Sequence, residues 1–152
     1  MNNAARAEIG HRLVPRTAGV IVEAWAPTRS GCLEELVRGV VETFADTRNA
    51  TATREVRLEV GAALDDDVVA ALIADVCHLL DADRLVVVDV ALEEAEDGNF
   101  DGTFFVAPVD AVLLTGAIPK AVSRSNVQFA PEGVLWRGRV LIDVSTAIDT
   151  LE

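Results

Sequence analysis

Apolar residues recur at helical spacing in the segment SGCLEELVRGVVETFAD, residues 30–46. The steps between them are three, one, three, one and three residues, which places them on one stripe of a helix. The stripe consists of Leu33, Leu36, Val37, Val40, Val41 and Phe44, and the charged positions outside it are Glu34, Glu35, Arg38 and Glu42. The pattern predicts an amphipathic helix with Ser30 as its N-cap.

A second helix is predicted over LDDDVVAALIADVCHLLDAD, residues 64–83. Its apolar stripe consists of Val69, Leu72, Ile73, Val76 and Leu80. Three aspartates, residues 65–67, fall in the first turn, where carboxylates cap a helix and meet the positive end of its dipole. We therefore interpret these aspartates as helix-start residues rather than as metal ligands.

Shorter apolar or alternating segments predict β-strands. TREVRLEVGA alternates apolar and charged residues with the period of two that a half-buried strand shows. Further strands are expected at residues 19–27, 84–94, 102–109 and 134–144, the middle two forming a hairpin. The order strand, helix, strand, helix and then several strands predicts a two-layer α+β fold, with two helices packed on a mixed or antiparallel sheet.

The N-terminal residues contain no apolar stretch, so we expect a mobile tail over residues 1–15, a single domain over 16–152 and no signal peptide. No run of about 18 apolar residues is present, and no membrane-spanning helix is expected. Cys32 and Cys77 form no disulfide framework. They are interpreted as reduced thiols of a cytoplasmic protein.

The charge of the chain limits its partners. The sequence has 25 acidic and 13 basic residues, a formal net charge of −12, and residues 51–100 contain 13 of the acidic and 3 of the basic ones. Such an acidic body repels phosphate backbones, so tight direct binding of nucleic acid is disfavoured. A protein partner with a basic face fits the charge better.

The stretch EAEDGNFDGTFF begins like a calcium-binding loop, with oxygen-bearing side chains at Asp97, Asn99 and Asp101 and a glycine at 102. The twelfth position of such a loop needs a bidentate glutamate, and Pro108 stands there. Aspartate, asparagine and glycine are also the residues that hairpin turns favour. We therefore predict a turn.

Two residues are not fully explained by an ordinary solvent-exposed surface. Lys120 is the only lysine among the 13 basic residues, and Asp143 interrupts the apolar strand RVLIDV. A surface ion pair of Asp143 with Arg139, which shares its strand face, is the simpler explanation for the aspartate.

Four segments, in this order, resemble the archease family. They are RTAGVIVEAWA at 16–26, the Leu-Glu-Glu-Leu run at 33–36, IPKAVSRS at 118–125 and VLWRGRVLIDV at 134–144. The resemblance covers nearly the whole chain after the tail and implies an archease-like fold.

The resemblance also implies a function. Archeases are small metal-binding proteins that activate a GTP-dependent RNA ligase in tRNA splicing and RNA repair without being enzymes themselves. In the family, two aspartates and a main-chain carbonyl hold a divalent cation such as calcium. By this resemblance Asp143 and Val144 are the expected metal ligands, and Lys120 and Thr17 match further positions of the family motifs.

Three positions depart from the family pattern. Arg16 and Ser125 stand where the family has histidines, and Gly19 stands where it has the first metal-binding aspartate. Losing one carboxylate of two weakens a site for a hard cation. The charge of Arg16 is one candidate replacement for the ion, and a carboxylate from elsewhere, such as Glu23, is a candidate replacement for the lost ligand.

Three functions follow as hypotheses. The first is an archease-like accessory protein that modulates an RNA ligase by contact, with a degraded cation site. The second is a chaperone-like interaction module that kept the fold and no longer binds metal. The third, a metal-dependent enzyme acting on phosphate esters, ranks last because it needs clustered carboxylates and a base.

Overall fold

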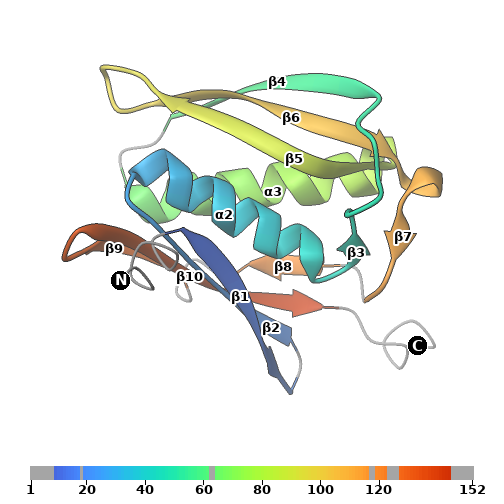
Figure 1. Ribbon diagram of the computed structural model, residues 1–152, viewed down its shortest axis with the longest axis horizontal. Coiled ribbons are helices and arrows are strands. Elements are labelled where there is room, and N and C mark those ends of the chain that lie inside the picture. Colours follow the sequence, from blue (N-terminus) through green and yellow to red (C-terminus); the bar gives the residue numbers. More distant parts are fainter. Residues whose placement is uncertain (1–8, 18, 62–63, 117–118, 123–126, 145–152) are drawn as a thin grey trace, which may run out of the picture.

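The computed structural model describes residues 9–17, 19–61, 64–116, 119–122 and 127–144 (Figure 1). In chain order the elements are β1 (Gly10–Arg16), β2 (Gly19–Ala26), α2 (Arg29–Glu42), β3 (Ala45–Asp46), β4 (Arg54–Val60), α3 (Asp65–Asp83), β5 (Leu85–Glu94), β6 (Phe100–Pro108), the 3-10 turn η1 (Val109–Ala111), β7 (Leu113–Leu114), β8 (Pro119–Val122), β9 (Gln128–Glu132) and β10 (Leu135–Val144). None of the described helices is both long and apolar enough to cross a membrane.

The strands pair antiparallel in two main sheets, with the helices between them (Figure 1). One sheet has the order β1-β2-β10-β8, with β9 also paired to β10, and the other has the order β4-β6-β5. Helix α2 contacts both sheets, chiefly through β2 and β5. The predicted class, α+β with two helices packed on antiparallel strands, is confirmed. The strands form a layer on each side of the helices rather than one layer, because alternation marks a strand without saying which strands pair.

The core lies in this helix layer. Every position of the two apolar stripes is buried, and the predicted hairpin of β5 and β6 is present. The facing sheet positions are filled by aromatic and branched side chains, among them Val22, Phe100, Phe104, Val140 and Ile142. Val22, Val140 and Ile142 pack β2 and β10 against the helices, and the opposite faces of these two strands are free to form a site.

The expected mobile tail over residues 1–15 is wrong for its last six residues, because residues 10–15 belong to β1. Each of them pairs with β2, from Gly10 opposite Trp25 onward. The inward positions of β1 are His11 and the partly buried Leu13, and a carboxylate satisfies the histidine. A polar residue at an inward position hides the alternation, so the sequence gives no strand signal here. Residues 1–8 lie outside the described residues.

The helix starts also differ from the prediction. Helix α2 begins at Arg29, and its cap is Thr28, whose Oγ1 accepts a hydrogen bond from Gly31 N at 3.0 Å. Ser30 is therefore not the N-cap. The residue before α3 is Leu64, which makes no side-chain cap, and Asp65 instead accepts hydrogen bonds from Arg29. These contacts join the first turns of the two helices.

Candidate functional site

The family-like segments meet on the outer face of the β1-β2-β10-β8 sheet. Gly19 of β2 lies opposite Arg16 of β1 on one side and opposite Asp143 of β10 on the other. On its far side Asp143 lies opposite Ala121 of β8, next to Lys120. Residues directly opposite each other in an antiparallel sheet share a face. Arg16 and Asp143 therefore flank Gly19 on one face, although 127 positions separate them in the sequence.

A hollow of about 370 Å³ lies over this row. Its lining consists of Arg16, Thr17, Gly19, Ile21, Arg139, Leu141 and Asp143. Three of the five sequence-predicted site residues, Arg16, Thr17 and Asp143, thus line one hollow. Val144 ends β10 opposite Pro119, after an irregularity in the register. The side chains of Lys120 and Val144, and residue Ser125 as a whole, lie outside the described part of the structure.

Gly19 stands where the resemblance puts a family aspartate, and its surroundings leave no room for that side chain. A Cβ atom added at this position would lie 2.3 Å from the backbone oxygen of Ile142 and 3.3 Å from its carbonyl carbon. Because both close atoms belong to the backbone, a side chain fits only if β2 and β10 move apart. The close approach of β2 and β10 at this point therefore requires a glycine.

The described residues do not fit a divalent cation at this place. Such an ion takes several oxygen ligands, carboxylates above all. Asp143 is the only carboxylate among the residues that line the hollow, and two arginines, Arg16 and Arg139, line it as well. Across the described part of the chain, no group of three or more His, Cys, Asp or Glu side chains is placed to hold a metal.

Glu23, the carboxylate that the sequence suggested as a replacement ligand, does not take the place of the missing aspartate. Glu23 is engaged two rows away, where it pairs with Arg12 and lies 3.7 Å from Arg139 Nε. The simple ion pair of Arg139 with Asp143 is therefore absent, because Arg139 turns to Glu23. Among the described residues, Asp143 and Arg16 each make no ion pair, so the hollow holds one anionic and one cationic group without described partners.

The calcium-like loop is a hairpin turn, as predicted. Asn99 N donates to Asp97 Oδ1 at 3.0 Å, and Ala95 N donates to Asn99 O at 2.8 Å, which closes the turn between β5 and β6. Gly98 has a φ of 85°, the left-handed region that favours glycine. Pro108, at the twelfth position, ends strand β6.

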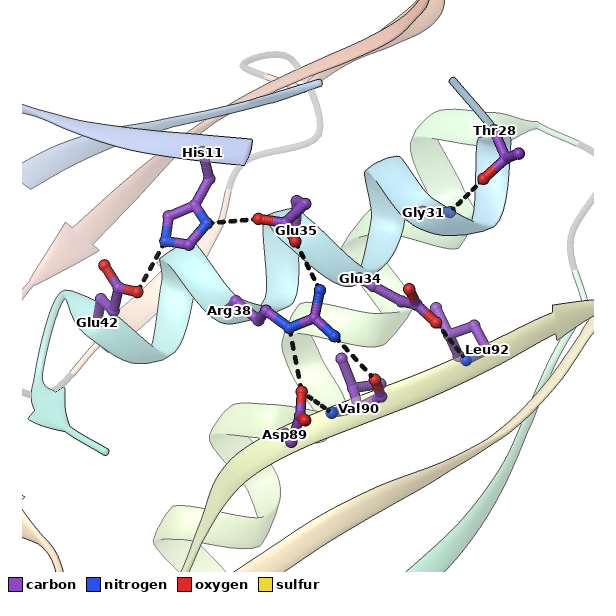
Figure 2. A network of polar contacts seen from close by, with 10 residues as sticks. All are labelled: His11, Thr28, Gly31, Glu34, Glu35, Arg38, Glu42, Asp89, Val90 and Leu92. Carbon is purple, nitrogen blue, oxygen red and sulfur yellow. Dashed lines mark hydrogen bonds and ion pairs between the residues drawn. The ribbon is translucent and has the colours of Figure 1, made fainter. Parts of the chain in front are cut away.

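A polar network on the side of α2 between β1 and β5 was not predicted (Figure 2). His11 Nδ1 lies 2.7 Å from Glu35 Oε1, and His11 Nε2 lies 2.8 Å from Glu42 Oε2. Arg38 donates to Glu35 at 2.6 Å and to Asp89 of β5 at 3.0 Å. The network therefore runs from β1 across α2 to β5 and links the two sheets.

The network shifts the pKa values of its members. The hydrogen bond with Glu35 raises the pKa of His11, and the same bond lowers the pKa of Glu35, while burial opposes both shifts. Glu35 is buried, unlike the exposed position predicted for it, because α2 is covered from two sides. The seven-residue spacing of Glu35 and Glu42, which puts both on one helix face, is the sequence signal that indicates a shared cation.

The thiols offer no reactive group. Cys32 and Cys77 are both free, as expected. Burial raises the pKa of the Cys32 thiol to about 12, and burial also raises the pKa of Cys77. A nucleophilic cysteine needs a lowered pKa, so neither thiol is a candidate nucleophile.

Comparison with known proteins identifies relatives over most of the chain. The model of the archease protein family matches residues 11–144. Proteins named "Probable protein archease" in two strains of Mycobacterium tuberculosis are 40% identical over 135 residues, which is 89% of this chain and 75% of theirs.

Solved structures share the fold. A crystal structure from Thermotoga maritima, described as an archease and possible chaperone, has a TM-score of 0.59 and 17% identity over 88% of this chain and 96% of that one. A solution structure from Methanobacterium thermoautotrophicum has a TM-score of 0.60 and 20% identity over 89% and 99% of the two chains. Each likeness extends over most of both chains.

Proposed function

Because this chain belongs to the archease family, we propose that it is a non-catalytic accessory protein that modulates a GTP-dependent RNA ligase by direct protein contact. The resemblance of its motifs to that family supports the ligase as partner. One structural observation carries the proposal, namely that Arg16, Gly19 and Asp143 form a single row beside the strand of Lys120. Its two free cysteines suit a reducing compartment such as the cytoplasm.

The proposed mode of action needs no divalent cation at the row formed by Arg16, Gly19 and Asp143. A cation between two carboxylates supplies positive charge, and here Arg16 and Arg139 supply it from the lining of the hollow. A guanidinium is always charged, so the surface presented to a partner keeps its positive charge without metal.

The proposal is tested by ligation turnover with a GTP-dependent RNA ligase of the same organism. We expect the protein to raise turnover, and we expect Asp143→Asn and Lys120→Gln each to lower that stimulation about tenfold. Asp101→Asn, which removes one exposed carboxylate from the opposite sheet, is the matched control and should leave stimulation unchanged. Loss of stimulation in the control alone would contradict the proposed surface.

The cation is tested separately, on the isolated protein. Calcium is added while the amide NMR signals are followed, and no saturable shift is expected at Gly19 or Asp143. A saturable shift at both residues would restore the family's cation site and refute the arginine replacement, whatever the ligation result.

A chaperone-like interaction module is the second candidate. The observation that favours it is the closed backbone contact of Gly19 with Ile142, which removes the position of one family ligand. The ligation experiment separates the two, because a module without a ligase partner leaves turnover unchanged at every concentration.

A further inference from the structure

A second hollow, of about 450 Å³, lies on the same outer sheet face, next to the one over Asp143. Its lining consists of Arg12, Glu23, Ala24, Trp25, Gln128, Glu132, Arg137, Gly138 and Arg139. Arg139 belongs to both hollows, so together they form one surface across β1, β2, β9 and β10. This surface, called the arginine face below, is defined by Arg12, Arg16, Arg137 and Arg139.

We propose that the arginine face binds a short, extended, carboxylate-rich segment of a partner protein. This inference does not depend on the ligase proposed above, since it concerns the chemistry of the ligand and not the identity of the partner.

Three of the four guanidinium groups of this face lie beside a glutamate. Arg12 Nε pairs with Glu23, Arg139 Nε lies 3.7 Å from Glu23 Oε2, and Arg137 Nε lies 2.9 Å from Glu132 Oε1. In each case the contact is to Nε.

That arrangement prepares the arginines for a carboxylate. A guanidinium offers several N–H donors in a planar fork, and it binds a carboxylate best through two parallel hydrogen bonds. Each fork has five N–H donors, more than one glutamate carboxylate can use, so donors remain for a ligand. The arginine side chains are 41–68% exposed, so a ligand reaches them without displacing the core.

The spacing of the arginines matches an extended chain. Arg137 and Arg139 are two residues apart on β10 and face the same side, which places them about 7 Å apart. Arg12 shares a row with Arg139, because both lie opposite Glu23. An extended segment with acidic residues at alternate positions repeats its carboxylates at the same distance on one side.

The overall charge decides between an acidic segment and a nucleic acid. The arginine face has four arginines against the three carboxylates of Glu23, Glu132 and Asp143, while the whole chain has a net charge of −12. A polynucleotide extends beyond this face and is repelled by the acidic remainder. A short acidic segment meets only the face itself.

The other sheet shows the contrast. On its outer face Glu59, Asp101 and Glu93 lie directly opposite one another across three strands. Arg57 of β4 lies on the same outer face, but these carboxylates outnumber it, so arginines predominate only on the arginine face.

The test measures fluorescence anisotropy of a labelled peptide in which glutamate and serine alternate. Its matched probe has glutamine in place of each glutamate. The variant R137Q/R139Q removes two arginines of the face, and the control R54Q/R57Q removes two exposed arginines of β4. Thermal unfolding of both variants verifies that each is folded.

We expect the glutamate peptide to bind and the glutamine peptide not to bind. R137Q/R139Q should weaken binding at least tenfold, about 1.4 kcal/mol, whereas R54Q/R57Q should leave it unchanged. Absence of binding to the full-length protein, or equal binding by the two variants, would overturn the proposal. Tighter binding of a single-stranded RNA of equal length through the same arginines would also overturn it, in favour of a phosphate ligand.

Discussion

His11 Nδ1 and Glu35 Oε1 lie 2.7 Å apart and join the edge strand β1 to helix α2 (Figure 2). The second ring nitrogen of His11 faces Glu42 at 2.8 Å. With a carboxylate at each nitrogen, the imidazole donates two hydrogen bonds and carries a positive charge. The short N-terminal strand is therefore attached to the helix layer by a titratable group, and its attachment depends on pH.

Stability should fall as the pH rises from mildly acidic to alkaline values. The pKa of His11 is raised in the folded protein, so its contribution is complete below about 6.5 and is lost as the pH rises through the higher folded value. The pKa of Glu35 is lowered, so its contribution is present above about 4.3 and is lost only in stronger acid. Thermal unfolding from pH 5 to 9 measures the effect.

His11→Gln should remove most of this dependence between pH 6 and pH 9. The matched control is His78→Gln, because His78 is the only other histidine and is exposed on α3. An unchanged pH profile in the His11 variant would show that the contact with Glu35 contributes nothing to stability.

Glu35→Gln should destabilise the protein by about 2 kcal/mol, because it leaves His11 and Arg38 without their shared charged acceptor. For a chain of this length that lowers the melting temperature by roughly 4–8 °C. Glu42→Gln is the control, since the Glu42 side chain is 48% exposed and exposed pairs are worth about 0.5 kcal/mol. Equal losses in the two variants would contradict the central role of Glu35.

The two α-helices and several strands can be predicted from periodicity alone. The stripe of α3 and the alternation of β4 are strong signals because each element exposes one side and buries the other. β1 gives no such signal, since its inward residues include His11, and the partner of that residue lies 24 positions away. Periodicity also predicts an exposed Glu35. It does not show that a second sheet covers the other side of the helix.

The site was predictable only through the family resemblance. Arg16, Thr17 and Asp143 line one hollow, yet nothing local in the sequence places β10 beside β2. The reason for Gly19 is also invisible in sequence, because it is the carbonyl of Ile142 that occupies the space a side chain would need. The pairing register of strands that are distant in sequence determines both the lining of the hollow and the need for a glycine at position 19.

Gly19→Asp should not restore a cation site, although it restores the family residue. The new Cβ would lie 2.3 Å from Ile142 O, so β2 and β10 must separate where their hydrogen bonds hold the sheet together. Overpacking of this kind costs about 1–3 kcal/mol. Gly19→Ala should cost a similar amount, since the clash begins at Cβ. Calcium-dependent stabilisation of the aspartate variant but not of the alanine variant would show that the strands adapt.

Glu34→Ala should expose one backbone position of β5 to solvent. β5 is an edge strand of its sheet, and such edges tend to pair with other chains unless they are blocked. Glu34 Oε2 accepts a hydrogen bond from Leu92 N at 2.8 Å, and Arg38 donates to Val90 O at 3.4 Å, so helix α2 covers this edge with its own side chains (Figure 2).

Removing the Glu34 carboxylate leaves the Leu92 amide without its acceptor, and hydrogen exchange at that amide should accelerate by about tenfold, as loss of a hydrogen bond worth about 1.4 kcal/mol implies. Glu93→Ala is the control, because Glu93 is exposed on the outer face of the same strand. If Leu92 exchanges equally slowly in both variants, its protection comes from the packing of the strand and not from Glu34. If the Glu34 variant alone also self-associates at high concentration, the carboxylate additionally keeps the edge of β5 from pairing with a second copy.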